Sequence, residues 1–242
     1  VFGGQTAFFY SLVLEQRLFE DKITLKLGRF SAGEDFATSP LYWLYMNNGI
    51  DGNPVAIVLN TRFSTYPNAV WGGMLRATPS PDWFAQVGAF QISPRTSDPA
   101  YQGMSWAIFP SDGILLLAQA GWTPSQHRPE VTAAAGPAKR LEPDALAPVL
   151  PGHYWIGAYS ATWPFPEFTG GGTAAVSYGF YAHADQMVWQ EEPGSDQGII
   201  LWASAVFSPQ QQIAPLPFQL NAGLVGKGLL PGRNSDSLLF GF

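Results

Sequence analysis

The 242-residue chain contains no cysteine and few charged residues, and each shortage excludes a class of function. Without thiols the chain can form no disulfide, no thiolate metal site and no cysteine nucleophile. Charged residues make up 12% of the chain and the formal net charge is −6. That share is roughly half of the ~25% found in ordinary globular proteins. An acidic chain without a basic run disfavours a nucleic-acid partner, because phosphate binding requires clustered Lys and Arg.

Long apolar runs are also missing. The most apolar stretch, residues 114–118, is far shorter than the ~18 residues that a membrane-spanning helix requires. If this chain enters a membrane it must therefore do so with β-strands, because only helices and closed barrels satisfy the backbone groups within lipid.

Short segments in which apolar and polar residues alternate fill most of the chain. In Ile23–Leu27 the apolar residues recur at every second position, with Thr24 and Lys26 between them. A period of two predicts a strand with one apolar and one polar face. Segments of ~10 alternating residues separated by turns are typical of transmembrane β-barrels. We expect strands at residues 8–19, 23–30, 69–76, 83–89, 113–122, 154–162, 176–190, 197–207, 218–224 and 237–242.

Two segments interrupt this series of strands. Residues 54–62 have the composition of a strand, but counting them as one places the short turn at 78–82 and the long link at 92–112 on the wrong sides of a barrel. We therefore interpret residues 31–68 as one long outer loop, part of which folds back into the lumen. Residues 123–151, rich in Pro and Ala, are interpreted as a mobile insertion.

Four blocks of the sequence resemble the carbohydrate-selective outer-membrane porins of the OprB family. They are LEQRLFEDKITLKLGRFSAGEDFATSPLY, WGGMLRATPSPDWFAQVGAFQIS, PGHYWIGAYSAT and the tail from ADQMVWQE to the final GF. The resemblance implies an all-β, antiparallel transmembrane barrel of about sixteen strands, of which this chain supplies about ten. Residues 1–242 would then form a single, incomplete barrel domain.

The function implied by the resemblance is passive, carbohydrate-selective diffusion across the bacterial outer membrane. The expected partners are mono- or oligosaccharides and outer-membrane lipid, and porins of this kind can form homotrimers. The family has no catalytic residues, and we expect no cofactor and no metal. His127, His153 and His183 are too widely spaced for an HExxH-type metal site.

The candidates for lining a sugar pathway are charged side chains at the alternate strand positions that form the polar faces. A channel for sugars needs hydrogen-bonding groups beside flat apolar surfaces, and the planar fork of Arg can engage two adjacent hydroxyls. The alternative is that these charges only solvate the inner wall. The candidates are Arg17, Lys26, Arg76, Asp185 and Lys227 on strands, with Asp35 and Arg62 in the inward loop.

Arg29 is an exception, because it shares parity with the apolar residues Leu25 and Leu27. Either a bulge after Gly28 turns Arg29 inward, or it lies at the rim among headgroups. We favour the inward position, with Arg29 anchoring the loop through Glu34 or Asp35.

Aromatic residues near strand ends are expected to form the interfacial belts of a barrel. These are Phe8, Tyr10, Phe19, Trp71, Trp83, Trp122, Trp155 and Trp163. Trp43, with Tyr42 and Tyr45, lies in the folded loop instead, which makes these three the candidates for stacking on a sugar ring.

The alternative from another class is a soluble, secreted all-β carbohydrate-binding module or a β-sandwich glycoside hydrolase. The two interpretations differ in what meets the apolar faces of the strands, because a sandwich buries them against a second sheet and a barrel turns them towards lipid.

Overall fold

The computed structural model describes residues 9–124, 150–192 and 195–242, and places ten strands of this part of the chain in one antiparallel sheet. Each strand pairs with the next in the sequence, so the sheet is an up-and-down meander. The ten expected segments are all confirmed as strands. They are β1 (Leu12–Leu18), β2 (Ile23–Phe30), β3 (Val70–Ser80), β4 (Trp83–Ile92), β5 (Gly113–Trp122), β6 (Gly152–Pro166), β7 (Thr173–Gln190), β8 (Gly198–Phe207), β9 (Phe218–Lys227) and β10 (Ser237–Gly241).

The sheet separates its residues into a covered face and an exposed apolar face. Along β5 every second residue is buried, and those between them are exposed. Leu116 on β5 and Ile156 on β6 are 51% and 69% exposed, although both are large and apolar. Within the described residues no second sheet covers this apolar face, which is contrary to the sandwich alternative. Continuous exposure of large apolar side chains is the arrangement expected of a surface that meets lipid.

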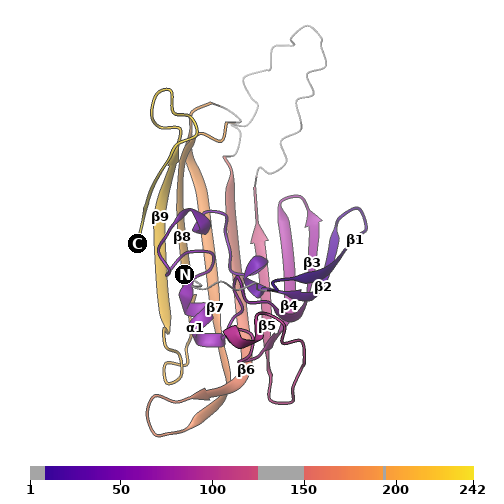
Figure 1. The fold of residues 1–242 in the computed structure, drawn as a ribbon. Helices are drawn as coiled ribbons and strands as arrows, with labels where there is room; N and C mark the ends of the chain where they lie inside the picture. The colour runs from indigo at the N-terminus through magenta and orange to yellow at the C-terminus, as the bar shows by residue number, and fades with distance from the viewer. Residues whose placement is uncertain (1–8, 125–149, 193–194) are drawn as a thin grey trace.

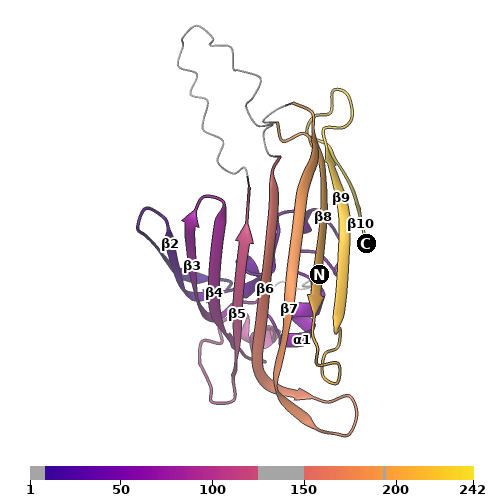
Figure 2. The same ribbon diagram turned by 180° about the vertical axis from the view of Figure 1, so that it is seen from behind.

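The sheet is curved, and residues 31–68 lie on its concave side (Figure 1, in front of the strands; Figure 2, behind them). This segment, which we call the inner segment, joins β2 to β3 and contains helix α1 (Val55–Thr61) and the short 3-10 helices η1 (Ala32–Glu34) and η2 (Tyr42–Leu44). Apolar residues between the inner segment and the sheet form a core that includes Phe30, Phe36, Ile57 and Phe90. A further 3-10 helix, η3 (Pro99–Tyr101), lies in the link from β4 to β5.

Helix α1 occupies the stretch whose composition alone suggested a strand. Pro54 precedes its first residue, and Arg62 ends it in the left-handed conformation with φ 57°. An isolated helix of seven residues is unstable in water, so packing against the sheet must stabilise it. In the described ranges, no helix is long and apolar enough to cross a membrane.

The links between neighbouring strands differ widely in length. Residues 81–82 alone join β3 to β4, whereas 31–69 and 93–112 form the links at the opposite end of the sheet. The long link between β5 and β6 was expected to be a mobile insertion, and most of it, residues 125–149, lies outside the described residues.

Candidate functional site

Buried glutamines on the concave wall hold the backbone of the inner segment. On β4, Gln86 Nε2 donates a hydrogen bond to the carbonyl oxygen of Asp35 at 2.6 Å. On β5, Gln119 Oε1 accepts one from the N–H of Ala37 at 3.1 Å. Buried backbone groups require partners. Side chains of the sheet therefore provide hydrogen-bond partners for backbone groups of the inner segment, which does not pair with a strand.

A third glutamine, Gln219 on β9, caps helix α1. Its Oε1 accepts a hydrogen bond from the N–H of Ala56 at 2.7 Å, and its Nε2 donates to the carbonyl oxygen of Gly49 at 2.6 Å. The N-cap residue Pro54 makes no side-chain cap, and the first N–H groups of a helix have no intrahelical partner. Gln219 supplies that partner from a distant strand.

Three of the predicted pathway residues come together at one side of the inner segment. Lys26 Nζ on β2 lies 2.9 Å from a Glu34 oxygen and 2.8 Å from an Asp35 oxygen. Arg76 on β3 donates to Gln86 Oε1 at 3.2 Å, close enough to Asp35 to interact with its charge. Burial raises the pKa of Asp35 above its ordinary value, although Lys26 and Arg76 oppose that shift. The cations on this wall are thus balanced by carboxylates.

Asp185 lies in a separate cluster that the sequence did not reveal. One carboxylate oxygen of Asp185 is 2.8 Å from His183 Nε2, and the other is 2.8 Å from His153 Nδ1. The hydroxyl of Tyr42 is 2.8 Å from the remaining ring nitrogen of His183, and Trp155 stacks on the same ring at 5.0 Å. The two histidines are far apart in the sequence, so only the register of β6 and β7 brings them to one carboxylate. In the described parts of the chain, no group of three potential ligands could hold a metal ion.

These contacts correct the expectations for Tyr42 and Trp155 and place Tyr45. Tyr42 is fully buried, so it cannot stack on a sugar. Tyr45 packs against Trp202, whose Nε1 donates to its hydroxyl at 2.9 Å. Trp155 was expected in an interfacial belt, but it is buried on the concave face beside His183.

Arg29 does not pair with Glu34 or Asp35 as expected. Pairing of β2 with β3 runs without a register shift through Gly28 and Arg29, so no bulge reverses the side chain. Its guanidinium donates to the carbonyl oxygens of Ala69 at 3.0 Å and Gly103 at 3.2 Å, and to that of Ser105. Glu34 and Asp35, its expected partners, bind Lys26 instead. Arg29 therefore anchors the 93–112 link rather than residues 34 and 35 of the inner segment.

A family model described as "Carbohydrate-selective porin, OprB family" matches residues 1–242. The chain belongs to the OprB family. It is similar to Porin B of Pseudomonas aeruginosa, with 24% identity over 251 residues, covering 98% of this chain and 50% of that protein.

Two solved structures of OprB from Pseudomonas putida share the fold. The high-pH structure matches with a TM-score of 0.75 and 22% identity, covering 94% of this chain and 51% of that one. The low-pH structure matches with a TM-score of 0.52 and 21% identity, covering 96% and 50%. The chain therefore spans about half the length of these relatives. The expected β-barrel fold class and outer-membrane localisation are confirmed, and the family is one of porins rather than enzymes.

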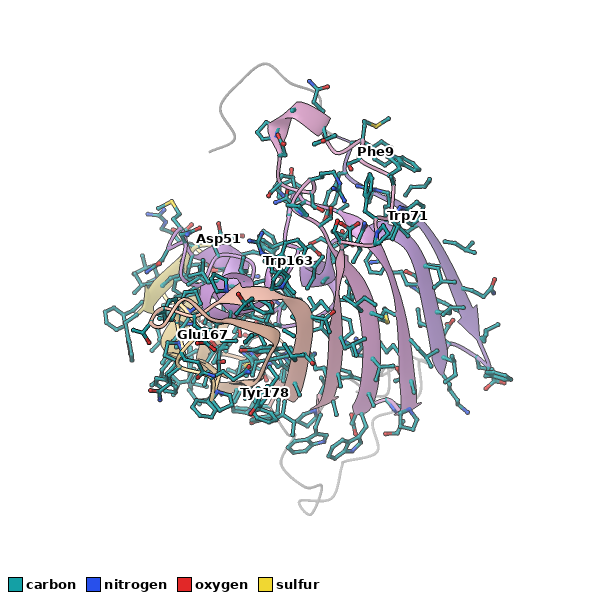
Figure 3. The ribbon with its side chains drawn as sticks, turned by 90° about the horizontal axis from the view of Figure 1, so that it is seen from below. Phe9, Asp51, Trp71, Trp163, Glu167 and Tyr178 are labelled. Atoms are coloured by element: carbon teal, nitrogen blue, oxygen red, sulfur yellow. The ribbon has the colours of Figure 1, made fainter. Side chains whose placement is uncertain are left out.

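In this member of the porin family, Trp43 and Arg62 are two further candidates for the sugar pathway. Both lie on the inner segment and are exposed. Trp43 is 55% exposed. Arg62 is also exposed, and its guanidinium lies 4.8 Å from the ring centroid of Trp163 on β6. Figure 3 shows Trp163 inside the arc of the sheet, near the inner segment that carries Asp51.

Arg17 and Lys227 lie instead at the end of the sheet that carries the short turns. Arg17 pairs with Glu15 of its own strand at 2.9 Å, and Lys227 pairs with Asp196 in the link before β8. They are not brought together with the other candidates.

The exposed apolar face ends in stacked aromatic rings. Trp83 stacks on Trp122 with ring centroids 6.0 Å apart, and Trp122 on Tyr154 at 5.4 Å. Flat aromatic groups at strand ends suit the boundary between lipid and water. Among the other expected belt residues, the hydroxyl of Tyr10 donates a hydrogen bond to the carboxylate of Glu34. The indole N–H of Trp71 donates to the carbonyl oxygen of Trp106. Phe8 lies outside the described residues.

Proposed function

We propose that this chain forms part of an outer-membrane barrel through which sugars diffuse passively. The observation that carries the proposal is the division of one curved sheet into two environments. Its apolar face is exposed, and its concave face holds a segment with polar and aromatic side chains. In a closed barrel the concave face borders water, so the inner segment, residues 31–68, would narrow the channel.

The paired charges of the concave wall favour uncharged solutes. Lys26 is shared by two carboxylates, and Asp185 by two histidines. An ion that passes this wall meets few unpaired charges that could replace its hydration shell, whereas a neutral sugar does not need them. The proposed substrates are therefore neutral mono- or oligosaccharides.

Arg62 is the candidate for direct contact with the sugar. No carboxylate among the described residues forms an ion pair with its guanidinium, which lies over the Trp163 ring. A planar donor fork can bind adjacent hydroxyls, and an indole offers an apolar surface to the C–H face of a sugar. Together these two side chains have the chemistry that a constriction for sugars requires.

Conductance of the full-length protein in planar bilayers tests this proposal. Glucose should reduce the current, and Arg62→Ala should weaken the block by glucose more than it changes the ion conductance. Arg233→Ala is the matched control, because Arg233 is an exposed arginine in the link from β9 to β10 and pairs with Asp236. A full-length protein that carries no ion current would refute the porin function, and a current that saturating glucose leaves unchanged would refute a sugar-selective site. Equal effects of the two substitutions would refute the role of Arg62.

The homotrimer suggested by the family resemblance stays a prediction. The mass of the detergent-solubilised full-length protein tests it, and a monomeric mass would contradict it.

A further inference from the structure

A cavity of about 430 Å³ lies between the residues that precede β1 and the inner segment. Sites for small molecules usually measure ~300–1,000 Å³, so this volume suits a sugar. Six residues supply its chemistry, namely Tyr10, Glu34, Trp43, Asn53, Thr65 and Tyr66. Arg62 is not among the residues that line it, which makes the cavity distinct from the constriction discussed above.

The polar wall of the cavity is fixed in position by hydrogen bonds. Asn53, only 4% exposed, donates from Nδ2 to three backbone carbonyl oxygens of residues 33–37 at 3.1–3.2 Å. Its Oδ1 accepts a hydrogen bond from the hydroxyl of Thr65 at 2.8 Å. These contacts hold the two sides of the inner segment together, so the wall is formed before any ligand arrives. A preformed site loses less entropy on binding.

Glu34 presents a carboxylate with unused acceptor capacity. One of its oxygens accepts from the hydroxyl of Tyr10, and the other from Lys26 Nζ at 2.9 Å. A carboxylate has about four acceptor positions, so about two remain for hydroxyl donors from the cavity. Pairs of adjacent hydroxyls are the donors that a pyranose offers.

Aromatic rings form the rest of the lining. Trp43 and Tyr66 are 55% and 61% exposed, which leaves much of each ring free to be covered by a ligand. Tyr10 meets Tyr66 edge to face, with ring centroids 5.1 Å apart. A flat apolar surface beside hydroxyl acceptors matches the two faces of a sugar ring, whose C–H groups are apolar and whose hydroxyls are polar.

The charge of the lining limits which sugars can enter. Glu34 is the charged side chain that lines the cavity, and no cation lines it. Lys26 lies behind Glu34 and is shared with Asp35. The group of Lys26, Glu34 and Asp35 carries a net charge of −1, and its cation does not line the cavity. An anionic ligand would therefore meet the carboxylate of Glu34 rather than the cation, which is unfavourable at short range.

We propose that this cavity is a binding subsite for neutral pyranose sugars that rejects sugar acids and sugar phosphates. The assignment rests on the proposed porin function, because it places a binding step within the sugar pathway. It predicts that neutral sugars bind at the Tyr10 side of the inner segment, before or after they pass Arg62.

Block of the full-length channel by glucose and by glucuronate in planar bilayers tests the subsite. Wild-type protein should be half-blocked by glucose at a concentration at least about tenfold lower than by glucuronate. Trp43→Ala should raise the half-blocking glucose concentration roughly fivefold through loss of apolar contact. Glu34→Gln removes the charge and should bring the two sugars closer together by about threefold or more.

Controls separate this subsite from the porin function itself. Met46→Ala is the matched control for Trp43, because Met46 is fully exposed on the same segment and does not line the cavity. Trp43→Phe keeps an aromatic ring and should retain most of the glucose affinity. It should also lose the part of the glucose-dependent change in tryptophan emission that comes from Trp43, while the part from Trp163 remains. This readout of the detergent-solubilised protein does not depend on the alanine variant folding.

The outcomes are distinguishable. If glucose blocks wild type while Trp43→Ala and Glu34→Gln behave like Met46→Ala, the subsite is refuted and the porin function stands. If wild type conducts ions but no sugar blocks it, the subsite is refuted and the porin function stands. If wild type carries no ion current, the porin function fails, and the subsite fails with it. Stronger block of wild type by glucuronate than by glucose would also overturn the proposed selectivity.

Discussion

Replacing Gln219 by Leu should release the inner segment from the wall without unfolding the sheet. Leucine has nearly the same volume but cannot hydrogen-bond, so the Ala56 N–H at the start of α1 would lose its partner at 2.7 Å. The carbonyl oxygen of Gly49 would keep one donor, the N–H of Val55 at 3.2 Å. Leaving one buried backbone group without a hydrogen-bond partner costs ~1–3 kcal/mol. We therefore expect α1 to open about 2 kcal/mol more easily, which is a factor of about 30 at 298 K.

Amide hydrogen exchange of the detergent-solubilised full-length protein measures this opening. Amides of residues 55–58 should exchange about 30 times faster in Gln219→Leu, while the strand amides stay protected. Gln210→Leu is the matched control, because Gln210 also bonds two backbone groups, Tyr178 N–H and the Val176 carbonyl, but does not touch the inner segment. Unchanged exchange in α1, or equal changes in both variants, would refute the idea that wall glutamines hold the segment.

Two further predictions concern charge. Lys26→Met would leave Glu34 and Asp35 without their shared cation, so the channel should become more cation-selective, while Lys26→Arg should not. The reversal potential in a salt gradient measures this, and no shift would contradict it. Burial opposes ionisation of Asp112, but hydrogen bonds from the Phe109 N–H and Gln91 and the charge of Arg95 hold its pKa below the ordinary 3.8. The stability that these contacts give the 93–112 link is present above pH 3.8 and is lost as the pH falls through the lowered folded pKa. Exchange of the Phe109 amide should therefore accelerate only in that acid range, and Asp112→Asn should remove this dependence.

The strands could be predicted because their alternation reflects the different media on the two faces of the sheet. Lys26 and Arg76 were placed on the polar face by parity alone, and the structure puts them on the concave wall. The same rule failed to explain Arg29, since parity says nothing about a distant link that covers one end of a strand. Its true partners, the carbonyl oxygens of residues 69, 103 and 105, carry no side-chain signal.

The conformation of the inner segment could not be predicted, because contacts from distant strands determine it. Residues 55–61 are rich in β-branched side chains, and the cap that favours a helix there comes from Gln219 on β9. Tyr42 was similarly ambiguous. Its position next to Trp43 suggested a sugar contact, but only the fold shows that it is buried against His183 while Trp43 is exposed.

The central claim is that the apolar face of the sheet meets lipid while the concave face does not. The 242 residues contain no cysteine. In a full-length protein whose remaining residues are also free of cysteine, single cysteines placed along β5 can each carry a fluorescent label after reconstitution with brominated lipid. Burial alternates at every residue of this strand. We predict strong quenching of labels at positions 114, 116, 118 and 120 and weak quenching at 115, 117 and 119. Uniform quenching along the strand, or protection of the even positions, would contradict the claim.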